Sequence, residues 1–205
     1  GEEFFDKILL SALKARGAVC GYNYRFGKMA QCNADNLAEF FKKVGGCVDI
    51  CPEITYLNHN ISSSSIRKKI EDGNVEDILP YCDPYTVYTV VEHGKKLGRA
   101  MGIPTINQHI PKEKISPKRG VYITECEIGE DVYPSITNVG SRPTTDGENA
   151  PENMETHIIG YDGDLYSSYI KVNFYKRLRD EKRFSSLDEL KEQIAKDCIA
   201  ASDYF

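Results

Sequence analysis

Hydrophobic spacing predicts two helices and two strands in the first part of the chain. Apolar residues recur every three to four positions over residues 2–16 and again over residues 36–44, as on one face of an amphipathic helix. Short apolar runs at residues 18–21 and 48–57 are typical of buried strands. The order strand, helix, strand predicts a parallel βαβ arrangement, although two strands are too few for a stable sheet by themselves. We therefore expect a partial α/β domain here.

From residue 83 onward, short β-rich runs alternate with clusters of turn residues. The predicted strands are residues 85–91, 120–128, 132–139, 155–161 and 169–175. Repeated short strands without intervening helices indicate a small antiparallel barrel or sandwich. Residues 162–164, Asp-Gly-Asp, are typical of a hairpin turn that joins the last two strands. These patterns predict two domains, at residues 1–82 and 83–205.

A final helix is predicted after the last strand. Ser186 followed by Glu189 is the pattern of a capping box, in which each side chain satisfies a backbone N–H group of the first turn. Apolar side chains then recur at helical spacing from Leu187 to Cys198, opposite a charged face. We expect this helix to pack against the barrel.

Composition and charge argue against several kinds of protein. The 205-residue chain has a net charge of −5 and neither half is basic, which argues against a general nucleic-acid binder. It contains no apolar run long enough to span a bilayer and no recognisable signal peptide. Its seven cysteines lack paired CxxC spacing, so reduced thiols are the simplest account. We therefore expect a cytoplasmic protein without nucleic-acid or membrane partners.

The segment 93–107 carries the residues best suited to bind a phosphate group. Three glycines allow the backbone to approach a ligand closely, and two lysines and an arginine supply positive charge. If the segment ends in an extended conformation, the Thr105 hydroxyl and the Asn107 amide point to the same side. Neutral oxygen ligands of this kind suit a metal ion that is bound together with phosphates. A solvated hairpin loop that Pro104 brings to an end is the alternative interpretation.

Glu155 stands in an otherwise apolar predicted strand. Burying a carboxylate is costly unless it has partners, so this residue is either a structural hydrogen-bond acceptor or a functional group. His157 alternates with it and lies on the same face of the strand. For His157, a half-buried imidazole with its hydrogen bonds satisfied is the simpler interpretation.

Two further motifs occur in the first domain. Residues 21–27, GYNYRFG, directly follow a predicted strand, which is where α/β proteins place ligands. Residues 61–67, ISSSSIR, place four serines at the start of a predicted helix, which first indicates a helix N-cap. The alternative is a phosphate site made of serine hydroxyls, helix N-terminal amides and Arg67.

These two motifs resemble elements of the FMN adenylyltransferase domain in the bacterial bifunctional riboflavin kinase/FAD synthetase family. The resemblance assigns Asn23, Ser64 and Arg67 to the remnant of that Rossmann-like nucleotidyltransferase domain. The family's H-x-G-H signature is absent, because none of the four histidines forms such a pair. We therefore expect an amino-terminally truncated chain, which starts after this signature and does not form FAD.

Residues 83–205 resemble the riboflavin kinase domain of the same family. Five motifs occur in family order and spacing: GRxxGIPTxN at 98–107, GVY at 120–122, NxGxRPT at 138–144, ExHI at 155–158 and LRxExxF at 178–184. The family often has alanine where this chain has Ile106, a position on the opposite side from Thr105 and Asn107. The resemblance implies an antiparallel six-stranded β-barrel with a C-terminal α-helix.

The resemblance also implies an activity. Riboflavin kinase transfers the γ-phosphoryl group of ATP, bound with Mg²⁺, to the ribityl 5′-hydroxyl of riboflavin, and so gives FMN. Glu155 would be the base that accepts the hydroxyl proton, while Thr105 and Asn107 would hold the metal and the phosphates. The other implied ATP-side residues are Gly94, Lys95, Gly98 and Arg99, and the implied flavin-side residues are Arg179, Glu181 and Phe184.

Two other functions remain as alternatives. A non-catalytic flavin- or nucleotide-binding regulatory module would keep the barrel but would not need Glu155, Thr105 and Asn107 together. A nucleic-acid-binding barrel would need a basic face with aromatic platforms, and the excess of acidic residues in 83–205 does not favour it.

Overall fold

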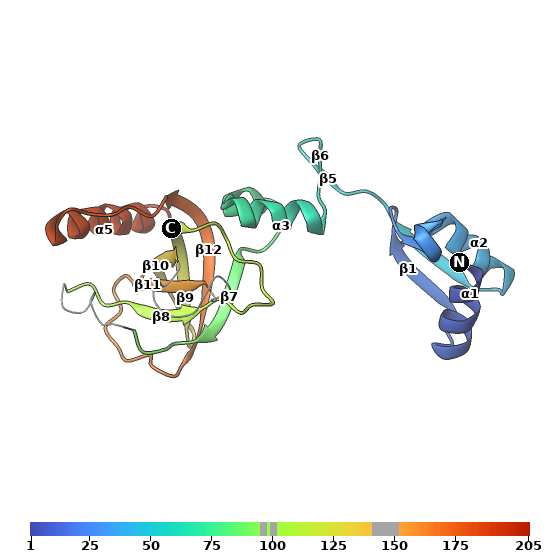
Figure 1. Cartoon of the computed structure of the whole chain (residues 1–205), viewed down its shortest axis with the longest axis horizontal. Coiled ribbons are helices and arrows are strands. Elements are labelled where there is room, and N and C mark those ends of the chain that lie inside the picture. The colour runs from blue at the N-terminus through green and yellow to red at the C-terminus, as the bar shows by residue number, and fades with distance from the viewer. Residues whose placement is uncertain (95–97, 99–101, 141–151) are drawn as a thin grey trace. The chain divides into compact units, whose positions relative to one another are not determined.

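The computed structural model describes residues 1–94, 98, 102–140 and 152–205 (Figure 1). The described chain forms two compact units, Gly1–Ser62 and Ser63–Phe205, and each is treated by itself. Within the described residues, no helix combines the length and the apolar character needed to cross a membrane.

The first unit contains the expected strand, helix, strand arrangement. Its main elements are α1 (Glu2–Phe4), which continues as the π-helical segment η1 (Phe5–Ala12), then β1 (Gly17–Gly21), α2 (Ala34–Lys43) and β4 (Cys47–Cys51). β1 and β4 pair in parallel, with Gly17 opposite Cys47. The second predicted strand ran to residue 57, but β4 ends at Cys51, because Pro52 lacks the N–H group that a continuing ladder requires.

Two short hairpins and an aromatic cluster complete the first unit. The hairpins are β2 (Arg25–Phe26) with β3 (Cys32–Asn33), joined by η2 (Lys28–Ala30), and β5 (Thr55–Tyr56) with β6 (His59–Asn60). Phe5 and Phe41 are buried and meet edge to face, with ring centroids 4.9 Å apart. At the start of α2, the side chains of Asn33 and Asn36 each accept the other's backbone N–H at 3.0 Å. The helix is therefore capped and buried on its aromatic face.

The second unit is built around a six-stranded antiparallel sheet (Figure 1). Its strands are β7 (Tyr85–Val90), β8 (Ile106–His109), β9 (Gly120–Ile128), β10 (Asp131–Gly140), β11 (Asn153–Ile158) and β12 (Tyr169–Arg179), in the spatial order β7-β12-β9-β10-β11-β8. The two edges meet where Glu92, just after β7, bridges to Asn107 in β8. There the side-chain amide of Gln108 also donates to the Thr89 carbonyl at 2.8 Å. The nearly closed barrel, with the C-terminal helix α5 (Leu187–Ser202), confirms the expected fold.

The expected hairpin between the last two strands is wrong. β12 pairs with β7 and β9, while β11 pairs with β10 and β8, so β11 and β12 are not neighbours. Residues 162–164 lie instead in the connection between them, where Asp164 Oδ1 accepts the Tyr166 N–H at 3.0 Å. An Asp-Gly-Asp sequence favours a local turn, whereas strand pairing is decided by which faces the strands bury in the barrel.

The barrel core includes the segment that precedes β7. Strand residues that are fully buried in it include Val87, Tyr122, Met154, Val172 and Phe174. Ile70 of α3 (Ser63–Asp72) and both Val75 and Ile78 of η3 (Val75–Ile78) belong to the same cluster. These helices therefore pack with the barrel, whereas the sequence-based boundary assigned them to the first domain. The domain division at residue 82 stays a prediction.

A row of buried hydroxyl groups fixes the orientation of β11. Thr124 in β9 contacts Thr137 in β10 at 2.8 Å between hydroxyl oxygens, and Thr137 contacts Thr156 in β11 at 2.9 Å. A hydroxyl can both donate and accept, so neighbours in the row satisfy one another. Thr156 therefore faces inward, and strand alternation turns Glu155 and His157 to the outer face of the barrel.

Candidate functional site

One row of cross-strand neighbours carries several of the predicted site residues. The directly opposed residues in β8, β11 and β10 are Asn107, Glu155 and Asn138. The row continues through Val121 in β9 to Arg179 in β12. Neighbouring strands lie about 4.8 Å apart, and opposed residues share one face of a sheet. The register therefore brings Asn107 and Glu155 side by side, although they are distant in the sequence.

Glu155 lies at a cavity surface and not in the protein interior. It is exposed, between Met154 and Thr156, which are fully buried. Its Oε1 accepts a hydrogen bond from the Asn153 side-chain amide at 3.4 Å. The neighbours of Glu155 in the strand thus face inward while Glu155 faces outward. The choice between a structural hydrogen-bond acceptor and a functional group stays open.

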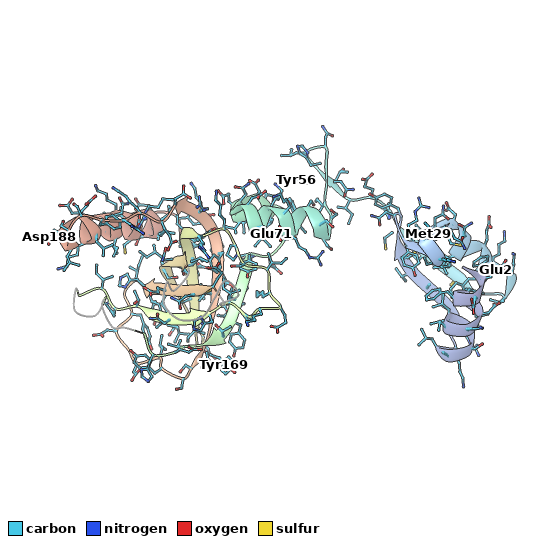
Figure 2. All side chains as sticks on the ribbon, viewed as in Figure 1. Glu2, Met29, Tyr56, Glu71, Tyr169 and Asp188 are labelled. Carbon is cyan, nitrogen blue, oxygen red and sulfur yellow. The ribbon has the colours of Figure 1, made fainter. Side chains whose placement is uncertain are left out.

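The outer face of the barrel and α5 enclose a cavity of about 580 Å³. Beside it, α5 packs against β10 and β9 (Figure 1), and Asp188 in Figure 2 marks the first turn of this helix. The apolar lining is Ile103, Val121, Ile136, Phe184, Leu187, Leu190 and Ile194. The polar lining includes Thr105, Asn138, Glu155, His157, Arg179 and Glu181. The cavity thus brings together Glu155 and the three flavin-side residues that the resemblance named.

Arg179 connects the cavity wall to α5. Its Nη2 and Nε donate to Asp197 Oδ2 at 2.7 and 3.0 Å, and Asp197 is buried. Asp197 also accepts a hydrogen bond from Gln193 at 2.9 Å. The guanidinium lies over the Phe184 ring, 5.9 Å from its centroid. Sequence reasoning missed Asp197, whose only signal was an acidic residue next to the apolar stripe of the last helix.

Glu181 occupies a position that a glycine leaves open. The Asn138 side-chain amide donates to Glu181 Oε1 at 3.2 Å. A Cβ built on Gly140 would overlap the Glu181 carboxylate, so a side chain there would displace it. The motif that starts at Asn138 did not by itself predict Asn138 as a site residue, and residues 142–144 of that motif lie outside the described residues.

A second cavity, of about 190 Å³, shares Thr105 with the first. Its lining includes Val91, Pro104, Ile106, Thr156, Ile158 and the connection formed by residues 161–166. In that connection the Tyr166 ring lies against His93, with ring centroids 4.0 Å apart. Sequence reasoning interpreted residues 162–164 only as a turn and missed their place in this wall. Thr105 is therefore common to both cavities.

Glycine backbones lie directly against the two candidate metal and phosphate ligands. A Cβ built on Gly94 would overlap the Asn107 side-chain amide. A Cβ built on Gly98 would lie 3.4 Å from the Thr105 hydroxyl and would overlap the Ile103 carbonyl. Such close approaches require a residue without a side chain. The predicted role of the glycines in binding a phosphate stays a prediction. The predicted Lys95 and Arg99 lie outside the described residues.

His157 has the satisfied, half-buried environment that its position suggested. Its Nδ1 lies 2.7 Å from the Pro104 carbonyl oxygen. A carbonyl oxygen can only accept, so Nδ1 is the donor in this bond. The hydrogen bond joins β11 to the residue that precedes Thr105.

The candidate residues from the adenylyltransferase resemblance belong to different compact units. Asn23 lies in the first unit, while Ser64 and Arg67 lie in α3 of the second. α3 begins at Ser63, within the run of four serines. The helix-cap and phosphate-site interpretations of these serines both stay predictions.

Comparison with known proteins agrees with this arrangement. A family model described as riboflavin kinase matches residues 81–205, and one described as FAD synthetase matches residues 1–65. The bifunctional riboflavin kinase/FMN adenylyltransferases of Bacillus subtilis (strain 168) and Escherichia coli (strain K12) are each 33% identical to this chain, over 100% of its length. The chain spans 65% of the length of each of these relatives.

A solved structure adds a match in fold. A crystal structure described as a macrolide-efflux protein from Streptococcus pneumoniae superimposes with a TM-score of 0.84 and 30% sequence identity, over 98% of this chain and 64% of that one. The riboflavin kinase model covers more than half of the chain, and the residues that it matches build the barrel, α5 and the lining of both cavities. The chain therefore belongs to the riboflavin kinase family.

Proposed function

We propose that this chain transfers the γ-phosphoryl group of ATP to the ribityl 5′-hydroxyl of riboflavin and forms FMN. The observation that carries the proposal is the meeting of Glu155 and Asn107 beside Thr105, the residue that two cavities share. Phosphoryl transfer requires two adjoining substrate sites, because the reacting atoms must approach to within about 3–3.5 Å.

The larger cavity suits the flavin. Its volume of about 580 Å³ lies in the range of small-molecule sites, which is roughly 300–1,000 Å³. A flat, largely apolar isoalloxazine ring would pack against the apolar side chains of α5. Arg179 and Glu181 would then supply hydrogen bonds to polar groups of the flavin, and the phosphates of ATP would lie at the smaller cavity, toward Thr105.

Glu155 is the proposed base. Its carboxylate is exposed to the larger cavity, where it can accept the proton of the attacking hydroxyl. Phosphoryl transfer depends mainly on positioning and on charge stabilisation, so one well-placed carboxylate is chemically sufficient. The Asn153 side-chain amide donates to this carboxylate at 3.4 Å, and Asn107 lies opposite Glu155 in the register of β8 and β11.

The residues around Thr105 and Asn107 fit a magnesium ion that arrives with ATP. The glycine backbone approaches both side chains closely: a Cβ at Gly94 would overlap the Asn107 amide, and a Cβ at Gly98 would lie 3.4 Å from the Thr105 hydroxyl. The described residues contain no group of three His, Cys, Asp or Glu side chains that could hold a metal ion by themselves. Mg²⁺ usually keeps several waters and shares phosphate oxygens with few protein ligands, which agrees with this arrangement. When bound, the ion would neutralise negative charge on the phosphates.

The proposal is tested by incubating the protein with riboflavin, ATP and magnesium and identifying the product by mass spectrometry. We expect FMN. Glu155→Gln should lower turnover by at least about 100-fold, the usual size of a general-base contribution, while riboflavin binding is retained. Glu130→Gln, in the exposed turn between β9 and β10, is the matched control and should be fully active. Absence of FMN with the wild-type protein would refute the proposal.

The alternative is a regulatory module that binds a flavin or a nucleotide without reaction. It would show saturable quenching of riboflavin fluorescence but no release of ADP. The combination of Glu155, Thr105 and Asn107 at one junction favours the enzyme, because binding alone does not require a base there. A cytoplasmic location and the absence of nucleic-acid or membrane partners stay predictions.

A further inference from the structure

The segment that carries Thr105 lies just outside the barrel ladder. β8 begins at Ile106, and its pairing with β11 ends at the pair Ile106 and Thr156. Pro104 has no N–H group, so the residue before Thr105 cannot extend this ladder as a donor. The pairing of β8 with β11 therefore fixes the backbone on the Ile106 side of Thr105 but not on the Pro104 side.

The His157 side chain links β11 to the segment just beyond the end of the ladder. In the register of β8 and β11, the next pair would join Thr105 to His157. The imidazole reaches one residue further, and its Nδ1 donates to the Pro104 carbonyl at 2.7 Å. Thr105 is thus held on both sides, by the ladder at Ile106 and by the imidazole at Pro104.

We propose that His157 is a positioning residue of the phosphoryl transfer, which fixes Thr105 relative to Glu155. The proposal rests on the proposed function. Glu155 and His157 lie on the same face of one strand, so the strand that carries the base also anchors the segment that carries the phosphate ligand. One rigid strand thereby sets the distance between the two groups. A displacement of about 1 Å between reacting groups can lower a rate about 100-fold.

The two ring nitrogens give two distinguishable roles. Nδ1 makes the bond to Pro104, and the ring also lines the larger cavity, where Nε2 could contact the flavin directly. An asparagine side chain places its amide about where Nδ1 lies, whereas a glutamine amide reaches about as far as Nε2. Substitution by each amide therefore separates positioning through Pro104 from a contact with the substrate.

The test compares His157→Asn, His157→Gln and His157→Leu in FMN formation and in direct binding of MgATP and riboflavin. We expect His157→Leu to lower kcat/KM for ATP by about 30- to 100-fold and to weaken MgATP binding, with riboflavin affinity changed less than about threefold. His157→Asn should recover activity to within about fivefold of wild type, and His157→Gln should not. His59→Leu, an exposed histidine of β6, is the matched control for loss of an imidazole. Thermal unfolding of each variant reports whether the fold is intact.

Two outcomes would overturn the proposal. Rescue by glutamine and not by asparagine, with weakened riboflavin binding, would make His157 a flavin contact. Full activity of a folded His157→Leu variant would show that the Pro104 bond is dispensable. These results are distinct from failure of the proposed function, since in that case the wild-type protein itself forms no FMN.

Discussion

At the scale of single residues, the site depends on places where a side chain is missing. Gly94 and Gly140 leave room for the Asn107 amide and the Glu181 carboxylate, respectively. In both cases the neighbouring atoms belong to a side chain and not to the backbone. A larger residue would therefore move the functional group and leave the fold in place.

Gly94→Ala is the sharpest test of this arrangement. The added methyl group would overlap the Asn107 side chain, which must then rotate away from its present position. We expect the KM for ATP to rise at least about tenfold, because a displaced ligand no longer meets the phosphates correctly. Steady-state kinetics with varied ATP would measure the effect.

Gly21→Ala is the control for this substitution. Its added Cβ would lie 3.3 Å from the tip of the Asn23 side chain, in the first compact unit, and Gly21 lines neither cavity. Equal ATP kinetics in the two variants would contradict a role for the Gly94 approach.

At the scale of elements, α5 is held against the barrel by one buried ion pair. Asp197 is 4% exposed. Its partner, Arg179, is the last residue of β12. Apolar packing of Ile194 and Ala201 against Val121 and Ile136 completes the attachment. Since α5 forms one wall of the larger cavity, any loosening of this helix also changes that cavity.

Asp197→Ala should lower the free energy of unfolding by about 3 kcal/mol. Removing one partner of a buried ion pair typically costs about 3–5 kcal/mol. The lower value applies because the Arg179 side chain is 22% exposed to solvent. Urea unfolding would measure the loss. Asp203→Asn, at the exposed end of α5, should cost almost nothing. A loss below about 1 kcal/mol, the value of a surface pair, would show that packing alone holds the helix.

The start of α5 gives a prediction about pH. The Ser186 hydroxyl accepts the Glu189 N–H as expected, but the Glu189 carboxylate bonds to Ser185 and not to Ser186, so only half of the predicted capping box forms. The pKa of Glu189 is lowered from 4.5 to about 2. The largest cause is the hydrogen bond from the Ser185 backbone N–H, followed by the bonds from the Ser185 hydroxyl and from Lys182.

A lowered pKa means that the Glu189 carboxylate contributes stability above its unfolded pKa and loses it as the pH falls. The melting temperature of the wild type should therefore exceed that of Glu189→Gln above pH 4.5. The difference should shrink as the pH falls from 4.5 toward 2. Thermal melts of both proteins at several pH values would measure it, and a difference independent of pH would contradict the assignment.

At the scale of the whole molecule, the division into units decides what can be removed. Ile70, Val75 and Ile78 precede residue 82 and are buried in the barrel core, so a fragment that starts at residue 83 lacks them. Each buried aliphatic side chain contributes about 1.5–3 kcal/mol. We expect the fragment 63–205 to be about 5 kcal/mol more stable than the fragment 83–205, as measured by urea unfolding. Equal midpoints would instead support the boundary at residue 82.

Much of the fold follows from local patterns, and the exceptions have physical causes. Short β-rich runs between turn residues located five barrel strands, but β8 has only four residues, too short a run to stand out in the sequence. The false hairpin at 162–164 arose because turn chemistry is local while strand pairing is not. At the candidate site, Glu155, Thr105 and Asn107 were named as candidates from motifs. Asn138 and Asp197 became visible only through the register of β10 and the packing of α5.

Thr105 has a consequence for how the two proposed substrates would influence one another. Because a single side chain belongs to both walls, a ligand that restrains it in one cavity alters the surface offered to the other. Linkage makes any such effect mutual: the factor by which ATP changes the affinity for riboflavin equals the factor by which riboflavin changes the affinity for ATP. Coupling free energies of this kind are typically about 1–3 kcal/mol, enough for one proposed substrate to change the affinity for the other by about 5- to 150-fold.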